Sequence, residues 1–108
     1  MSGYIFGNLV KGVVENIIDE SKTIITLNGD GSVDVADGDY VNNISFKCAT
    51  ASYLLNVGTT PAGTEIAEQE EVQQGITKDL HINHTMNGAT TFYFTGITAP
   101  TVITIYRR

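Results

Sequence analysis

Cysteine, basic residues and long apolar runs are scarce in this chain, and each scarcity excludes a class of protein. Cys48 is the only cysteine among 108 residues, so no disulfide can form within one chain. No stretch approaches the roughly 20 apolar residues of a membrane-spanning helix, so we expect no membrane insertion. Residues 1–22 contain Glu15, Asp19 and Glu20 and lack a continuous apolar stretch, so we expect no secretory signal.

Basic residues number six against twelve acidic ones, which gives a formal net charge of −6. Binding to nucleic-acid phosphates needs clustered Lys and Arg, and the only adjacent basic pair is Arg107-Arg108. We therefore expect no nucleic-acid partner, and no attraction to an anionic membrane surface. The acidic balance mainly favours solubility.

Signatures of catalysis are missing as well. The chain has no Gly-x-Ser-x-Gly element for a serine nucleophile and no glycine-rich phosphate-binding loop followed by lysine. Its carboxylates gather in one polar stretch, at Glu65, Glu68, Glu70 and Glu71. General acid–base chemistry needs carboxylates in distinct buried environments, whereas an acidic run is usually a solvated face. We expect no catalytic residues and no enzyme activity.

Two groups of residues resemble metal ligands without completing a site. Residues 28–34 carry oxygen side chains at alternate positions, as a calcium loop does, but Val33 and Asp39 replace its glycine and its closing glutamate. A turn explains them more simply, with calcium as the alternative. His81 and His84 are three residues apart, so a strand points them to opposite faces, one exposed and one inward or at an interface. We expect no cofactor and no metal; a metal on a symmetry axis, held by one His from each subunit, is the surviving alternative.

The length and apolar content are those of a single domain with an N-terminal extension. The 108 residues are 42% hydrophobic, and a domain of this size buries roughly 65% of its unfolded surface, enough for one core with little to spare. Contacts between copies would add stability, so we expect a homo-oligomer. We divide the chain into a docking or assembly segment, residues 1–22, and a β domain, residues 23–108.

The N-terminal segment carries an apolar stripe. Plotted at 100° per residue, its apolar positions form one continuous face, which favours an amphipathic helix, although Gly7 and Gly12 and the β-branched residues leave an extended strand as the alternative. We expect this stripe to dock on a partner or to assemble copies of the chain. It consists of Phe6, Leu9, Val10, Val13, Val14, Ile17 and Ile18.

From Thr23 onward, short alternating runs are separated by turn residues. Residues 23–27 and 32–35 are joined by Asn28-Gly29-Asp30-Gly31, which predicts a β-hairpin. Residues 58–63 predict a loop, and residues 65–74 a polar connection or edge strand. About eight short strands at this spacing predict an all-β fold: an antiparallel β-sandwich with a jelly-roll-like strand order.

Alternation also assigns the faces of individual strands. Ile44, Phe46 and Cys48 share one face, so we interpret Cys48 as an ordinary core residue. In residues 92–94, Tyr93 lies on the face opposite its two Phe neighbours. Tyr93 is therefore a cross-strand partner or a contact for a surface ligand.

Three segments of the second half resemble a recurrent domain of tailed-bacteriophage virion proteins. That domain has an extended strand running into an Ile-Gly-Thr-Thr-x-Gly-Gly-like turn, then a strand with an aromatic Tyr-Val pair, then a closing strand that ends in Tyr-Arg. The similarity covers roughly residues 40–108, and the chain departs from the pattern at Pro61-Ala62. The segments are Leu55-Asn56-Val57-Gly58-Thr59-Thr60-Pro61-Ala62-Gly63-Thr64-Glu65-Ile66, Thr91-Phe92-Tyr93-Phe94 and Val102-Ile103-Thr104-Ile105-Tyr106-Arg107-Arg108.

The resemblance implies a small head-fibre, capsid-decoration or tail-fibre protein, commonly a trimeric β-sandwich. We therefore expect a non-enzymatic structural or accessory protein, assembled in the host cytoplasm and located on the virion, with other virion proteins of the capsid or tail as partners. The alternative is a carbohydrate-binding or host-receptor-binding module of a phage fibre, with host surface glycans as ligands and Tyr93 as a contact.

Overall fold

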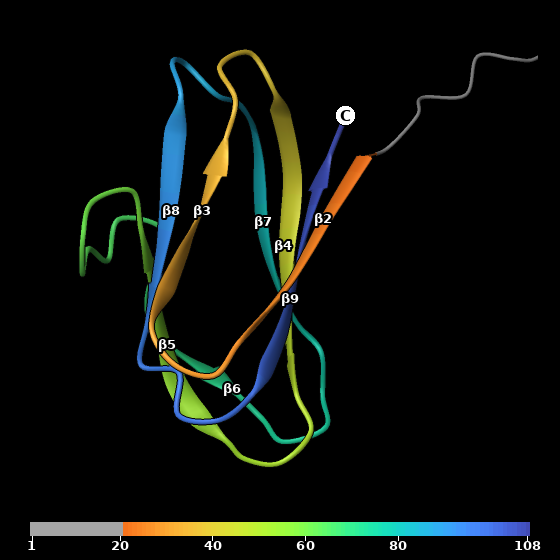
Figure 1. The fold of residues 1–108 in the computed structure, drawn as a ribbon, viewed down its shortest axis with the longest axis vertical. Coiled ribbons are helices and arrows are strands. Elements are labelled where there is room, and N and C mark those ends of the chain that lie inside the picture. The colour runs from red at the N-terminus through yellow and green to blue at the C-terminus, as the bar shows by residue number, and fades with distance from the viewer. Residues whose placement is uncertain (1–20) are drawn as a thin grey trace, which may run out of the picture.

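The computed structural model describes residues 21–108, which form eight β-strands and contain no helix (Figure 1). The expectation of an all-β fold with about eight short strands is confirmed. The first described strand is Ser21–Leu27, so it includes two residues that the sequence analysis placed in the N-terminal segment. The strands are β2 (Ser21–Leu27), β3 (Gly31–Val35), β4 (Tyr40–Cys48), β5 (Tyr53–Gly58), β6 (Ala67–Val72), β7 (Lys78–Thr85), β8 (Thr90–Thr95) and β9 (Thr101–Arg107).

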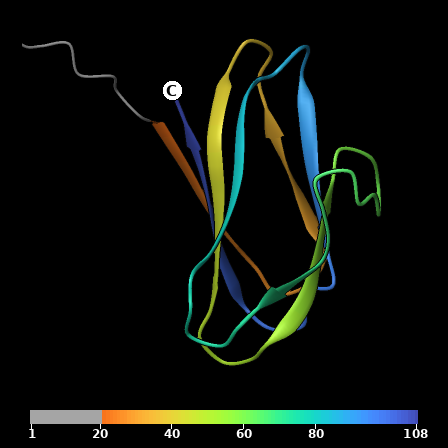
Figure 2. The ribbon, with the colours of Figure 1, turned by 180° about the vertical axis from the view of Figure 1, so that it is seen from behind.

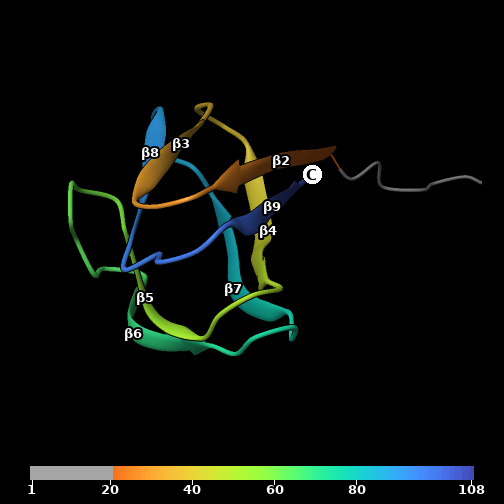
Figure 3. The same cartoon turned by 60° about the horizontal axis from the view of Figure 1, so that its bottom comes forward.

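The strands form two antiparallel sheets of four strands each. The order is β2-β9-β4-β7 in the first sheet and β3-β8-β5-β6 in the second, and Figure 3 shows the two sheets as separate layers. Only the β5–β6 connection joins two neighbours of one sheet; every other connection between the described strands crosses to the opposite sheet. The fold is therefore held mainly by pairings between strands distant in sequence, such as β2 with β9.

The hairpin predicted at residues 28–31 is wrong. β2 pairs with β9 and β3 pairs with β8, so this turn carries the chain from the first sheet to the second. The Asp30 carboxylate accepts a hydrogen bond from the Gly96 N–H at 2.9 Å, which fixes the turn to the β8–β9 connection. Turn residues specify that the chain reverses, but burial of Ile25 and Val33 against one core decides which strands pair.

The core lies between the sheets and draws side chains from both. Phe46 of β4 meets Phe94 of β8 edge-to-face, with ring centroids 5.6 Å apart and planes at 75°. Both Phe side chains are fully buried, as are Ile44 and Cys48, so the predicted inward face of β4 is confirmed. Cys48 is a free, buried thiol, as expected of an ordinary core residue.

One buried polar pair crosses this core. The Tyr53 hydroxyl lies 2.5 Å from Oγ1 of Thr101, which itself donates to the Ala99 carbonyl at 3.0 Å. The Tyr53 hydroxyl therefore donates to Thr101. Burial raises the pKa of Tyr53 above its ordinary value of 10.0, and the hydrogen bond to Thr101 opposes that rise. The pair ties β5 of the second sheet to β9 of the first.

The acidic stretch forms β6, the edge strand of the second sheet, which decides between the two sequence-based alternatives for residues 65–74. Its pairing with β5 shifts register between Leu55 and Val57. Gln69 there has a positive φ of 51°, and its N–H donates to the Asn56 side chain at 2.8 Å. Such a bulge twists an edge strand and disfavours pairing with another chain.

Candidate functional site

The described fold is open to solvent between β7 and β8. β7 is the edge strand of the first sheet, and Figure 2, seen from behind, brings it to the front. Residues 90–94 of β8 pair with β3. The pairing of β8 with β5 is shorter: Asn56–Gly58 of β5 lie opposite Tyr93–Thr95 of β8. Beyond Gly58 the chain leaves the second sheet, so residues 90–92 of β8 have no strand beside them on the β5 side.

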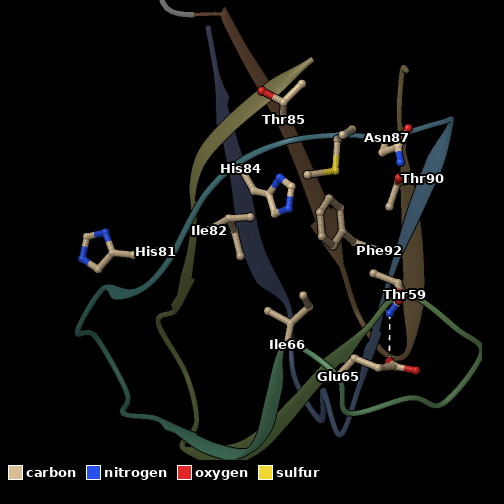
Figure 4. A pocket seen from close by; sticks show the side chains of 11 residues that line it. Thr59, Glu65, Ile66, His81, Ile82, His84, Thr85, Asn87, Thr90 and Phe92 are labelled. Carbon is tan, nitrogen blue, oxygen red and sulfur yellow. Dashed lines mark hydrogen bonds between the residues drawn. The ribbon is translucent and has the colours of Figure 1, made fainter. Parts of the chain in front are cut away.

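A pocket of about 400 Å³ occupies this place (Figure 4), and we call it the β7–β8 pocket. Its apolar lining comes from three parts of the chain: Ile82 and Met86 from β7 and its end, Phe92 from β8, and Ile66 from the loop before β6. Met86 and Phe92 are buried, whereas Ile66 and Ile82 are only partly covered. Polar residues surround these four: Thr59, Glu65, His81, His84, Thr85, Asn87 and Thr90.

One wall of the β7–β8 pocket is a loop locked by Glu65. Its carboxylate accepts hydrogen bonds from the Thr59 N–H at 3.0 Å and from the Thr60 hydroxyl at 2.6 Å. The Thr60 hydroxyl, followed by backbone N–H groups, lowers the pKa of Glu65 below its ordinary value of 4.5. The Glu65 carboxylate therefore holds the loop in shape.

The same lock explains the two glycines that bound the turn. A Cβ on Gly58 would lie 2.3 Å from Oε1 of Glu65 and 2.4 Å from the backbone carbon of Gly63. A Cβ on Gly63 would lie 2.3 Å from the same carboxylate oxygen. Such distances are far inside van der Waals contact. Because a Cβ on Gly58 would meet backbone, the packing of the loop requires glycine there, whereas a Cβ on Gly63 would meet only the side-chain ends of Glu65 and Thr60.

The histidines lie on two sides of β7. In register, His84 stands opposite the buried Val41, and His81 stands opposite Asn43 on the outer face. Figure 4 shows His84 directed toward Phe92 and His81 directed away from the pocket. The sequence predicted that a strand would point His81 and His84 to opposite faces. The inward histidine is nevertheless solvent-exposed, because no strand covers this stretch of β7.

Two of the carboxylates that the sequence analysis considered, Asp34 and Glu70, form contacts within the fold. The Asp34 side chain accepts from the Thr91 hydroxyl at 2.7 Å across β3 and β8, and Glu70 forms an ion pair with Lys78 at 2.7 Å. Within residues 21–108, no three His, Cys, Asp or Glu side chains gather closely enough to hold a metal ion.

Tyr93 lies where alternation placed it, on the outer face of the second sheet. Its neighbours Phe92 and Phe94 are buried, whereas Tyr93 is partly exposed, opposite Ser32 of β3 and Gly58 of β5. It does not line the β7–β8 pocket. A ligand contact at Tyr93 stays a prediction.

The two C-terminal arginines contact their own chain. The Arg107 guanidinium binds the Asp39 carboxylate at 3.1 Å and donates to the Thr23 hydroxyl at 2.8 Å. The Arg108 guanidinium lies 4.5 Å from the centroid of the Tyr40 ring. The Tyr-Arg ending therefore fastens the end of β9 to the start of β4.

The apolar stripe predicted for docking, Phe6 to Ile18, lies outside the described residues. The β7–β8 pocket itself was missed by sequence reasoning, because its lining residues are spread over residues 59–92 and share no periodicity. The only local signal was the loop at residues 58–63, which the sequence identified without assigning it to a pocket.

No helix in residues 21–108 is long and apolar enough to cross a membrane. No protein-family model, curated protein or solved structure matches this chain.

Proposed function

We propose that this chain is a non-enzymatic structural or accessory protein of a tailed-bacteriophage virion, of the capsid-decoration or head-fibre type. In this proposal it forms a trimer on the particle surface, and residues 1–22 attach it to other virion proteins or to further copies. Its localisation is the virion, after assembly in the host cytoplasm.

One observation carries the proposal most directly. The first two segments that resemble virion domains lie side by side, because Val57 of β5 pairs with Phe94 of β8. The turn between β5 and β6 is held by the Glu65 carboxylate and needs glycine at Gly58, where a Cβ would meet the backbone of Gly63. A physical requirement of this kind supports the interpretation of the Gly-Thr-Thr turn as a real motif.

The strand order supports the finer description of the fold as a jelly-roll β-sandwich. Eight strands in two four-stranded sheets, with nearly every connection crossing between sheets, suit two interlocked Greek keys. Jelly rolls are common among viral capsid and lectin domains. Because one fold hosts many functions, this agreement is an analogy of fold and adds support without deciding the function.

The alternative is a carbohydrate-binding or receptor-binding module of a phage fibre. The β7–β8 pocket favours it, because His84, Asn87 and Thr90 place polar groups beside the apolar side chain of Phe92. Sugar recognition uses this combination of hydrogen-bonding groups and an aromatic surface. Tyr93, on the other face of β8, is the second candidate contact.

Immunogold labelling of particles from the source of the chain tests the leading proposal. We expect label on the surface of intact particles, and a trimer mass for the purified full-length chain by light scattering coupled to size exclusion. Label confined to unassembled material would contradict it. A glycan array separates the alternative: binding that Asn87→Ala or Tyr93→Ala abolishes, by a chain absent from particles, would favour the binding module.

A further inference from the structure

We propose that β2, the edge strand of the first sheet opposite β7, is a contact surface for a second copy of this chain. The second copy adds its own β2 antiparallel to the first, so that one sheet continues across both copies. Each copy offers the same strand, which gives the contact two-fold symmetry. The inference goes beyond the proposed function, because a two-fold contact joins copies in pairs and differs from the contact that closes a trimer.

The pairing pattern of β2 differs from that of the other three sheet edges in residues 21–108. Edge strands are commonly protected from other chains by bulges, short length or charged side chains. β6 and β7 each contain a residue with positive φ, Gln69 at 51° and Asn83 at 49°, beside a shift of register with the neighbouring strand. β3 has only five residues, among them the charged Asp34. β2 has seven residues and pairs with β9 without a register shift, so its free edge offers a regular row of backbone groups to another strand.

Both faces of the first sheet carry uncovered apolar side chains at the β2 edge. On the outer face, Ile24 is 63% exposed and Val102 of the neighbouring β9 is 45% exposed. On the inner face, Ile25 and Leu27 pack against the core but are only partly buried. A strand added beside β2 would remove part of this surface from water, which favours pairing.

The side chains of β2 fit a second copy of β2. In an antiparallel pair centred on Ile24, the two Ile24 side chains lie opposite each other, and Lys22 of each copy lies opposite Thr26 of the other. Like charges in opposed positions destabilise paired strands, and Lys22 is the only charged residue of β2. Its Nζ lies 5.5 Å from the centroid of the Tyr106 ring of β9, so the charge is held over its own sheet. A second copy therefore matches this edge in charge as well as in backbone pattern.

Disulfide trapping on the full-length chain tests the register of the contact. Opposed residues of antiparallel strands have Cα atoms about 4.5–5.5 Å apart, a distance that a disulfide spans. Ile24→Cys should therefore give a symmetric disulfide-linked dimer under mild oxidation. Thr26→Cys is the matched control on the same face of the strand: its two copies would lie about 14 Å apart along the strands and should trap roughly tenfold less. A mixture of Lys22→Cys and Thr26→Cys chains should again give a linked dimer. Cys48 is buried and common to all variants.

Charge substitution at the centre of the contact supplies a second test. Ile24→Lys alone and Ile24→Glu alone should each halve the mass measured by light scattering, because like charges would face each other on the two-fold axis. Mixing the two variants should restore the paired species. Leu54→Lys, at an exposed apolar position on β5 of the other sheet, is the control and should associate like the unmodified chain.

The outcomes separate this contact from the proposed function. Equal trapping of Ile24→Cys and Thr26→Cys would overturn the contact, as would an assembly whose mass Ile24→Lys leaves unchanged. A mass of three copies without trapping at Ile24→Cys overturns the contact and leaves the proposed trimer standing. A mass of two copies with the expected trapping supports the contact and contradicts the trimer, whereas a mass of six copies supports both. A single-copy mass for the unmodified chain overturns both.

Discussion

The two halves of the same pair of sheets differ in how well they are closed. Where β5 pairs with β8, the core is sealed: Leu55, Phe46 and Phe94 are completely buried. Past Gly58 the chain leaves the second sheet, and β7 is less covered: Ile82 is half-buried and His84 is exposed. We call the first the closed part and the second the open part.

The difference arises from one change of direction in the chain rather than from a change in composition. Both parts have alternating strands with apolar inward faces. In the open part, however, the loop locked by Glu65 stands where β5 would otherwise continue. Stability should therefore be concentrated in the closed part, while the open part leaves apolar surface exposed to solvent.

The largest expected effect tests this division directly. Phe94→Ala removes a buried ring from the closed part and should lower the free energy of unfolding by about 3–5 kcal/mol. Ile82→Ala in the open part should cost about 1–2 kcal/mol, because its side chain is only partly removed from water. Urea denaturation of the two variants measures the contrast, and equal losses would contradict it.

The loop held by Glu65, which lies between the closed and open parts, should not tolerate a side chain at Gly58. Gly58→Ala places a Cβ against the backbone of Gly63 and should cost about 1–3 kcal/mol by overpacking. Gly29→Ala is the matched control, because a Cβ there meets no atom within 4 Å. Thermal unfolding compares them; a Gly58→Ala chain as stable as Gly29→Ala would show that the loop adjusts freely.

The buried polar pair sharpens the description of the closed part. Tyr53→Phe deletes the hydrogen bond to Thr101 and should cost about 1 kcal/mol. Tyr93→Phe, on the partly exposed outer face, should change stability by less than about 0.5 kcal/mol. Chemical denaturation provides both values. If the two substitutions cost the same, the cross-core bond contributes nothing measurable.

The smallest expected effect is the pH dependence of the stability that Glu65 gives to the loop. The pKa of Glu65 is lowered in the folded chain by the Thr60 hydroxyl and nearby N–H groups, and is near its ordinary 4.5 when these are absent. As the pH falls, Glu65 is therefore protonated at a higher pH in the unfolded chain than in the folded chain. The contribution of Glu65 to the free energy of unfolding is complete above about pH 4.5 and is lost as the pH falls through the lower pKa of the folded chain. Melting temperatures between pH 7 and pH 3 should fall less steeply for Glu65→Gln than for the unmodified chain. Glu68→Gln should follow the unmodified profile.

Much of the fold could be predicted locally. The inward face of Ile44, Phe46 and Cys48 and the outward position of Tyr93 follow from the two-residue period of a strand, which holds wherever one face is buried. The polar stretch at residues 65–74 was correctly limited to a connection or an edge strand, since a central strand would have placed its carboxylates beside apolar neighbours.

The hairpin that was predicted wrongly and the pocket that was not predicted have the same cause. The turn at residues 28–31 has hairpin residues, yet the strands on either side of it join different sheets. The β7–β8 pocket unites Ile66, Ile82 and Phe92, which no local pattern connects. The paired neighbour of a strand and the surfaces left uncovered depend on the whole packing.

The sequence by itself determined the all-β class, the strand faces and the single cysteine, because these depend on periodicity and composition. Only the tertiary structure decided that β2 pairs with β9, that Glu65 locks a turn, and that β7 and β8 leave an apolar floor open. Those features join residues far apart in the chain, and their energies exist only once the two sheets have come together.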